Sequence, residues 1–459
     1  MLSSAGFAIP VQTIEVTAGR IEALLPRSTP PGSAKLVVTT DGKASKPFSV
    51  TIAPSNPGIY SRNGEGWGAG RIDNIASSGA RSPNAYSNPA NPGQMIAITV
   101  TGLGQLREVT VVIGNRVSKA TRQGASLSAG DEELRVRIPS DVPQGCFVPL
   151  YLLETPTQAS NVVTIAVKHG AGECSPGVIP KLSGTKLGLV TLFRTRMKTQ
   201  DSNVESIRDE AKIVFGSADQ GNETPGSFDS MVVLPPPGTC NAYVSGFVSE
   251  GLTSTVAFSA MGGLASTWDA GVALTLRRGA QSRTVGRLPN GWYSGNLGAG
   301  GAAAKRGTAG PFLEPGELIV ESNGGADIGP FTLKADAPAP FEWTDLEQTA
   351  VIDRHRGSTV HWRGVPGDRL VLVVATNVDQ ITTSTGTCIC TARGSAGQLK
   401  IPAALLAHVP ATQDIPGIPF DQLYVASISA KETIPVKGNG LTGAAAVGVY
   451  ALGRIVEYR

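Results

Sequence analysis

The sequence predicts an all-β protein made of tandem Ig-like β-sandwich domains, and two features of the whole chain support this fold class. First, 41% of the 459 residues are hydrophobic, and they fall in short runs separated by stretches that draw on 56 glycines and 32 prolines. Short apolar runs bounded by turn residues are typical of β-strands. Second, part of the sequence is repeated. A chain of this length accommodates roughly three domains of the usual ~100–200 residues.

The repeat joins "LLPRSTPPGSAKLV" at 24–37 to "RIPSDVPQGCFVPL" at 137–150. At an offset of 113 residues Pro26 aligns with Pro139, Gly32 aligns with Gly145, and "VTIA" at 50–53 aligns with the identical "VTIA" at 163–166. Matches in register at this fixed distance indicate an internal repeat. Cys146 aligns with Ser33, so a disulfide at this position is expected in the second copy alone.

Residues 1–53, the first unit, match only the second half of the repeat. Strand-like runs occur at 11–16, 20–25, 33–40 and 47–53, and the pair Asp41-Gly42 predicts a hairpin turn. We therefore expect a partial Ig-like unit whose opening strands are missing or are supplied by another segment.

Residues 54–174, the second unit, carry the complete pattern. A turn-rich stretch precedes expected strands at 95–102, 109–114, 134–139, 147–154 and 161–167. Ile96, Ile98 and Val100 alternate and therefore lie on one face of their strand. About seven short strands in a segment of this length fit an Ig-like sandwich.

The motifs "PSNPGIY", "SNPANPGQMIAITVTGLG", "IPSDVPQGCFVPLYL" and "SNVVTIAV" identify a resemblance. Together they resemble the Ig-like C-terminal repeat module of secreted, mostly uncharacterised proteins of Solibacter-type acidobacteria, over about 54–174 and as a half copy at 19–53. Residues 241–459 are similar, through "WDAGVALTL" and "VHWRGVPGD", to tails that accompany this module. The resemblance implies an exported, modular, all-β protein and supplies no reaction. It also implies a disulfide between Cys146 and Cys174.

The remaining chain is expected to form two more sandwiches. Residues 175–199 read as a linker followed by a strand at 186–197, and the sandwiches are expected at 200–337 and 338–459, split near "APAPF". One amphipathic helix is expected near 202–216. There Val204, Ile207, Ala211 and Val214 have helical spacing, and Ser202 with Glu205 forms a capping box.

The five cysteines are spaced unlike a zinc ribbon or finger. Buried free thiols are one interpretation. The other is a pair of disulfides: Cys146 opens a strand and Cys174 ends the same unit, and Cys240 is expected to bond Cys390 or Cys388. Disulfides would place the protein outside a reducing cytosol. One cysteine remains without an expected role.

Motifs of the common enzyme classes are absent from the sequence, including Gly-x-Ser-x-Gly, Walker A and His-Glu-x-x-His. Only four histidines occur. Asp353, His355 and His361 in "IDRHRGSTVHW" are the candidates for a metal or acid-base site, if a hairpin brings them together. The alternative is a charged turn before a strand, with His361 and Trp362 on opposite faces. His169 is expected in a solvated turn, and His408 is expected to be a cation at the end of a short helix or strand. No cofactor is expected.

Two further site types are open. Glycoside chemistry needs two acids ~5–9.5 Å apart, and Glu314, Glu317 and Asp269 are candidates, although solvated turn acids are the ordinary interpretation. Sugar stacking could use the tryptophans, although aromatic rings usually belong to sandwich cores. The five are Trp67, Trp268, Trp292, Trp343 and Trp362.

Charge gives no sign of nucleic-acid binding, because 39 basic and 36 acidic residues leave a net charge of +3. Arg194 and Arg196 alternate along one strand and are expected on a solvated face. No apolar run approaches the ~18–20 residues of a membrane span.

These observations predict a secreted modular protein with a structural or binding role, such as adhesion or recognition of an extracellular glycan or protein. The alternative is an extracellular hydrolase with its site in the 180–459 region. The chain is expected in the extracellular medium or at the cell surface, with the export signal upstream or removed.

Overall fold

The computed structural model describes residues 2–4, 7–26, 29–123, 130–175, 186–198, 205–217, 233–246, 268–413, 421–433, 437–438 and 440–459. Within these residues the chain is built almost entirely of strands, which confirms the all-β fold class. The α-helical part of the described chain is one turn, α2 (Ala403–Leu406). The 3-10 turns are η1 (Leu346–Gln348) and η2 (Gly394–Ala396). No helix of the described chain is long and apolar enough to span a membrane.

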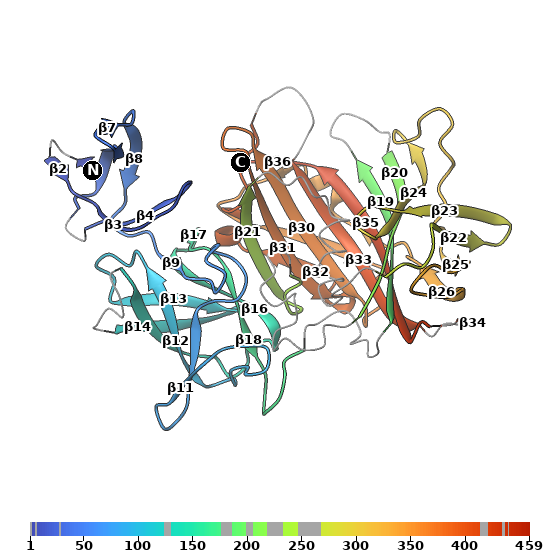
Figure 1. Cartoon of the computed structure of the whole chain (residues 1–459), viewed down its shortest axis with the longest axis horizontal. Coiled ribbons are helices and arrows are strands. Elements are labelled where there is room, and N and C mark those ends of the chain that lie inside the picture. Colours follow the sequence, from blue (N-terminus) through green and yellow to red (C-terminus); the bar gives the residue numbers. More distant parts are fainter. Residues whose placement is uncertain are drawn as a thin grey trace.

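The first unit contains a four-stranded sheet, in the order β2-β1-β5-β8, and two hairpins (Figure 1). Its strands are β1 (Leu2–Ser4), β2 (Phe7–Ile9), β3 (Gln12–Val16), β4 (Ile21–Leu24), β5 (Gly32–Leu36), β6 (Thr39–Thr40), β7 (Lys43–Ala44) and β8 (Phe48–Ile52). Asp41 and Gly42 join β6 to β7 with positive φ angles of 51° and 74°, the conformation that a type I′ hairpin turn requires. The predicted turn is confirmed.

The second unit is a ten-stranded sheet that folds around its own core. Its strands are β9 (Gly58–Ile59), β10 (Ile72–Ile75), β11 (Arg81–Pro83), β12 (Met95–Thr101), β13 (Glu108–Ile113), β14 (Arg116–Gln123), β15 (Glu132–Arg137), β16 (Gly145–Thr155), β17 (Gln158–Ala159) and β18 (Val163–Val167). Ile96, Ile98 and Val100 of β12 are fully buried, as their alternation predicts.

A thirteen-stranded sheet dominates the rest of the chain and appears in Figure 1 as the green to red ribbons. Its strands up to residue 337 are β19 (Leu187–Lys198), β20 (Glu205–Gly216), β21 (Thr239–Gly246), β22 (Ala273–Arg278), β23 (Gln281–Arg287), β24 (Tyr293–Gly301), β25 (Gly316–Ser322) and β26 (Phe331–Ala337). The later ones are β30 (Leu370–Asp379), β31 (Ser384–Arg393), β33 (Gln422–Thr433), β34 (Lys437–Gly438) and β35 (Gly443–Ile455).

Small sheets complete the C-terminal part. They are formed by β27 (Glu342–Trp343), β29 (Ser358–Arg363) and β32 (Gln398–Ile401), and by β28 (Val351–Ile352) with β36 (Glu457–Tyr458). The thirteen-stranded sheet continues across the predicted boundary at 337/338, because β19 and β35 pair along twelve positions. The apolar clusters also cross this boundary, because the cluster around Trp343 includes Cys240 and the cluster around Phe312 includes Ala444. The division into 200–337 and 338–459 stays a prediction.

The predicted helix near 202–216 is wrong, because Glu205–Gly216 forms strand β20, and residues 202–204 lie outside the described chain. Ala211, Ile213 and Phe215 alternate into one apolar cluster. β20 pairs along its whole length with β19 on one side and is bonded to β24 on the other. Glu205 forms an ion pair with Arg196 in place of a helix cap. Pairing with a strand on each side thus overrides the helical spacing of the sequence.

The solvated face expected for Arg194 and Arg196 is also wrong at Arg194, whose side chain is 7% exposed. Its guanidinium forms two hydrogen bonds of 2.8 Å with Asp209, which is fully buried, and one of 2.8 Å with Glu314. Asp209 also accepts the backbone N–H groups of Phe312 and Leu313. This network ties the loop before β25 to the centre of the sheet.

Two disulfides join the elements, and both match the expected pairs. Cys146–Cys174 closes 28 residues and Cys240–Cys390 closes 150 residues. In a chain-entropy estimate, loops of these lengths contribute about 3–4 and about 5 kcal/mol to stability. Cys240 and Cys390 lie directly opposite each other on β21 and β31, while Ala242 lies opposite Cys388. Cys388 therefore remains a buried free thiol.

Candidate binding site

The predicted metal or acid-base residues are Asp353, His355 and His361, and the side chains of Asp353 and His361 form ion pairs with different residues. Asp353 accepts the His355 backbone N–H at 2.9 Å and pairs with Arg356 at 3.1 Å. His361 lies on β29, where its Nδ1 is 2.7 Å from Asp345 Oδ2. In the part of the chain that the structure describes, no group of three or more His, Cys, Asp or Glu side chains could hold a metal ion.

The partner of His361, Asp345, was missed by the sequence analysis. Its Oδ1 accepts both the Trp343 indole N–H at 2.7 Å and the His361 backbone N–H at 2.9 Å. Asp345 thus fixes the pairing of β27 with β29. His361 is exposed and Trp362 is buried, so the two side chains lie on opposite faces as predicted.

The candidate acids for glycoside chemistry are each held by a different group. Glu314 pairs with Arg194 at 2.8 Å and Glu317 pairs with Lys334 at 2.9 Å. Asp269 accepts the Gly271 N–H at 2.7 Å and lies 3.5 Å from Arg287. Of the three, only Glu317 lines the cavity described below.

The tryptophans belong mainly to the apolar interior. Trp343 and Trp362 are 3% and 4% exposed and share one cluster. Trp67, Trp268 and Trp292 are half-buried against other clusters. None of the five lines the cavity.

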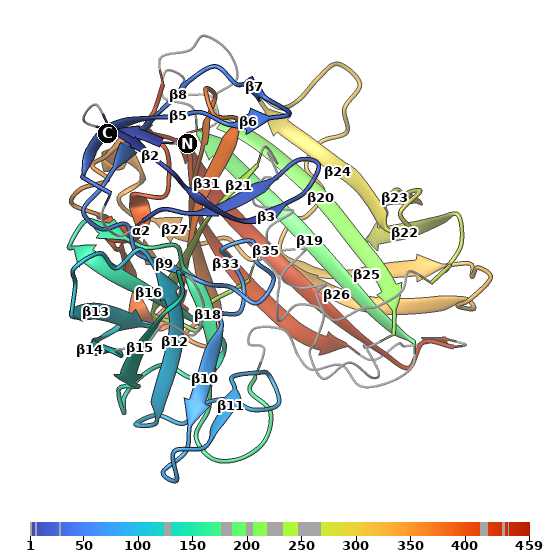
Figure 2. The ribbon, with the colours of Figure 1, turned by 60° about the vertical axis from the view of Figure 1, so that its left-hand side comes forward.

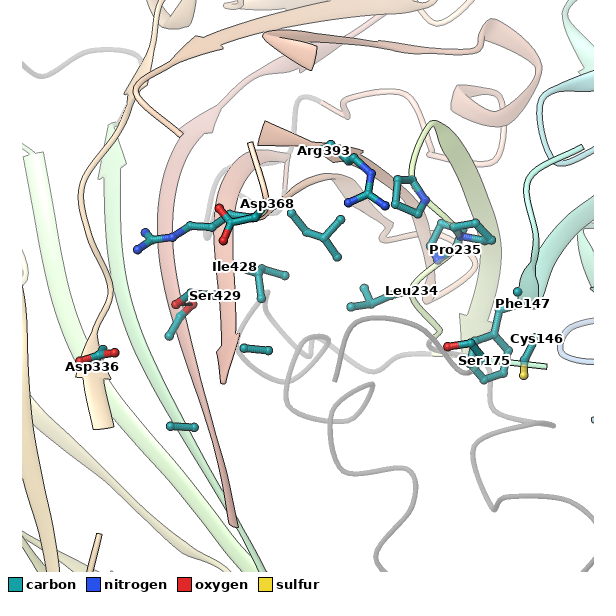
Figure 3. Close-up of a pocket in the computed structure, with 18 of the residues that line it drawn as sticks. Cys146, Phe147, Ser175, Leu234, Pro235, Asp336, Asp368, Arg393, Ile428 and Ser429 are labelled. Carbon is teal, nitrogen blue, oxygen red and sulfur yellow. Dashed lines mark hydrogen bonds between the residues drawn. The ribbon is translucent and has the colours of Figure 1, made fainter. Parts of the chain in front are cut away.

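A cavity of about 840 Å³ lies between the second unit and one face of the thirteen-stranded sheet (Figure 3). Phe147 and the Cys146–Cys174 disulfide form one wall with Ser175, and Asp336 of β26 lies on the opposite side. The segment 234–237 runs between the second unit and β31. The volume of the cavity falls in the ~300–1,000 Å³ range of ligand pockets.

The floor of the cavity is apolar and continues into the core. Leu234, Leu370 and Ile428 belong to, or pack against, the cluster that covers this face of the sheet. Gly448 of β35 keeps the floor low, because a Cβ there would lie 3.0 Å from Ser429 Oγ and 3.3 Å from the Asp336 carbonyl oxygen. β26 can therefore cross close above β35.

The rim of the cavity is charged. Three acids (Glu317, Asp336 and Asp368) and three bases (Lys334, Arg369 and Arg393) line it, so their formal charges cancel. Among the described residues, the side chains of Asp368, Arg369 and Arg393 make no hydrogen bond or ion pair. In the view of Figure 3, Asp368 and Arg393 lie above Leu234 and Ile428. These charges are available to a ligand.

The two sides of the cavity are held together by apolar and polar contacts. Val112, Tyr151 and Val162 of the second unit are buried in the same cluster as Trp343 and Trp362. Asn115 of the second unit donates a 3.0 Å hydrogen bond to the Gly238 carbonyl. Pro235 in turn accepts a 2.6 Å hydrogen bond from Thr391 of β31. The cavity is therefore built on a fixed frame.

The sequence held no local signal for this site. Its residues come from β16, the 234–237 segment, β25, β26, β30, β31, β33 and β35, which lie up to three hundred residues apart. A motif search detects spacing within one segment, and here each segment contributes only one to four residues.

Comparisons with known proteins add little to this picture. No family model and no curated protein matches the chain. Among solved structures it is similar to the yeast delta-COP-I mu-homology domain, with 8% identity and a TM-score of 0.19 over 61% of this chain and 100% of the other. It also matches the N-terminal four Ig domains of Dscam1 isoform 9.44, with 8% identity and a TM-score of 0.12 over 98% and 90% of the two chains. For an endo-fucoidan hydrolase of glycoside hydrolase family 107, the identity is 10% and the TM-score 0.12 over 88% and 45%. Scores this low carry no argument about fold or function.

Proposed function

We propose that the chain is an exported, modular binding protein that recognises a segment of an extracellular protein in the cavity beside the second unit. Export is supported by the two disulfides, since structural disulfides persist in oxidising compartments. The modular character is supported by the repeat and by the resemblance of 54–174 to a module of secreted proteins.

The observation that carries the binding role is the set of unpartnered charges over an apolar floor. Asp368, Arg369 and Arg393 have no side-chain partner among the described residues, whereas Leu234 and Ile428 below them are 8% and 3% exposed. Apolar area supplies affinity, and a few placed charges fix the orientation of a ligand. A rim with three charges of each sign suits a ligand that carries both signs.

A peptide segment meets these requirements better than a sugar. An extended peptide presents apolar and charged side chains alternately and can contact the floor and the rim together. Sugar sites rely on flat aromatic surfaces, and Phe147 is the aromatic residue that lines this cavity. We therefore assign a protein ligand in preference to a glycan.

The test is to pan a displayed library of random peptides against the whole chain and to measure the affinity of enriched peptides by fluorescence anisotropy. Arg393→Glu should weaken binding by about ten- to a hundredfold, because it reverses a charge that faces the ligand. Raising the salt concentration should also weaken it. Arg306→Glu is the matched control, since Arg306 is also exposed, its side chain makes no hydrogen bond or ion pair among the described residues, and it lies outside the cavity.

Failure to enrich any peptide, or equal affinity of Arg393→Glu and the parent chain, would refute the proposed site. A glycan array screened in parallel separates the two ligand classes. If a glycan bound and Arg393→Glu abolished that binding, the cavity would remain the binding site, but its ligand would be a glycan and not a protein.

A further inference from the structure

The first unit has no apolar core of its own. Ala34 is its one buried residue among those described, and no described residue before Ile59 belongs to any of the five apolar clusters. Its large apolar side chains are exposed instead. The exposed fractions are 51% for Ile14, 65% for Val16, 47% for Ile21, 38% for Leu25 and 69% for Phe48.

The second unit shows what normally happens to these positions. At the repeat offset Ile21 corresponds to Leu134 and Leu25 to Ile138, which are 0% and 1% exposed. Val50 and Ile52, both half-buried, correspond to Val163 and Ile165, both fully buried. Side chains at positions that form the core of the second unit are thus exposed or only half-buried in the first unit.

The backbones support this equivalence. Gly32 opens β5 with a φ of 130°, and Gly145 opens β16 with a φ of 156°. β5 pairs antiparallel with β8, as β16 does with β18, although the register differs by two residues at Gly145 and by three from Val148 onward. At the repeat offset β4 corresponds to β15, whereas β14 corresponds to residues 3–10, which hold β1 and β2. β3 is therefore not the counterpart of β14, but in the β3–β4 hairpin, which Figure 2 shows between the four-stranded sheet and the second unit, it lies beside β4 as β14 lies beside β15. The Arg20 carbonyl faces β3, so that Ile21 turns its backbone groups to the other edge, just as the Ile138 N–H faces β12.

In the second unit β12 covers these residues. It pairs antiparallel with β15, so that Ile98 lies opposite Leu134 and Ile96 lies opposite Val136. In the first unit β4 pairs with β3, and no other described strand pairs with it. The free edge of β4 is the edge that β12 occupies on β15.

We propose that a partner polypeptide adds a strand to the free edge of β4, antiparallel to it, with apolar residues opposite Ile21 and Ala23. Strand addition to an exposed edge is a recurrent mode of protein recognition, in which the backbone supplies affinity and alternate side chains supply specificity. A second copy of this chain is a poor donor, because its own β12 already pairs with β10 and β15. The surface is separate from the cavity, so either proposal can fail alone.

The probe is a fluorescent peptide of residues 94–102 with lysines added at both ends for solubility. It carries the strand that covers the equivalent edge. Titration of the whole chain should give saturable binding below roughly 100 µM, and hydrogen exchange of the amides at 21–25 should slow in the complex. Ile21→Lys should weaken binding by about ten- to a hundredfold, because it places a charge where an apolar side chain is to be buried.

Two controls keep the test specific. Ile381→Lys alters an equally large apolar residue, 82% exposed on the turn between β30 and β31, and should leave binding unchanged. A peptide of the same composition without the alternation should not bind. Equal binding of both peptides, or of both lysine variants, would overturn the proposal. So would a concentration-dependent dimer that Ile21→Lys abolishes, since a second copy would then be the occupant.

Discussion

Replacing Asp209 by alanine should be among the most destabilising single changes in the thirteen-stranded sheet. The substitution removes the partner of Arg194, a guanidinium that is 7% exposed, and leaves two buried N–H groups without their acceptor. Burial disfavours the charge on Arg194, but its hydrogen bonds with Asp209 and Glu314 outweigh burial and raise the pKa of Arg194. Without Asp209, the Arg194 guanidinium keeps only Glu314 to offset the cost of burying its charge.

The magnitude follows from these contacts. Breaking a buried ion pair by removing one partner costs about 3–5 kcal/mol, and each orphaned amide adds about 1 kcal/mol or more. We expect a loss of about 5 kcal/mol in the free energy of unfolding of this region. Asp209→Asn, which keeps an acceptor oxygen but loses the charge, should fall between the parent and Asp209→Ala.

Urea unfolding followed by tryptophan fluorescence measures this loss, because Trp268 packs against the cluster that contains Phe312 and Leu313. The control is Asp141→Ala, which breaks the Arg116–Asp141 pair, 2.6 Å long but 42% and 65% exposed. An exposed pair contributes at most about 1 kcal/mol. If both alanine variants lost the same small amount, the argument that burial governs the Asp209 network would be refuted.

Other predictions concern the free thiol and a histidine. Burial raises the pKa of Cys388 to about 12, so the thiol should resist iodoacetamide in the folded chain and react after unfolding; its recovery in a disulfide by non-reducing peptide mapping would contradict the pairing of Cys240 with Cys390. Burial lowers the pKa of His408, whose Nε2 has no partner among the described residues. As the pH falls below about 6.5, the histidine is therefore protonated in the unfolded chain before it is protonated in the folded chain. Proton binding then favours the unfolded chain, and stability is lost. Thermal unfolding between neutral and mildly acidic pH should therefore show a shallower decline for His408→Asn than for the parent, and identical slopes would exclude this residue as a source of acid sensitivity.

The histidines and cysteines show how far local patterns reach. The placement of His408 just after a short helix agrees with the prediction, but burial of the ring lowers the pKa of His408 and so disfavours the expected cation. His169 is exposed in its turn, as expected. The choice of Cys390 over Cys388 depends on which residue lies opposite Cys240, and that register is set by two whole strands.

The residues of the candidate site were also predicted only in part. Glu317 was singled out from the sequence, but as one of a catalytic pair, whereas the structure places it beside Lys334 on a cavity rim. Arg369 and Arg393 were not predicted as site residues, because an isolated arginine next to a strand is ordinary on a protein surface. Their significance depends on segments far away in the chain that meet around the same floor.

The sequence by itself determined the all-β class, most of the strands and the Asp41-Gly42 turn. These depend on alternation, turn chemistry and repetition, which act over a few neighbouring residues or can be compared by alignment. Tertiary structure alone decided that 205–216 is a strand, that Arg194 is buried and where the cavity lies. Each of these depends on pairing or desolvation by residues distant in the chain, and a local pattern carries no information about such partners.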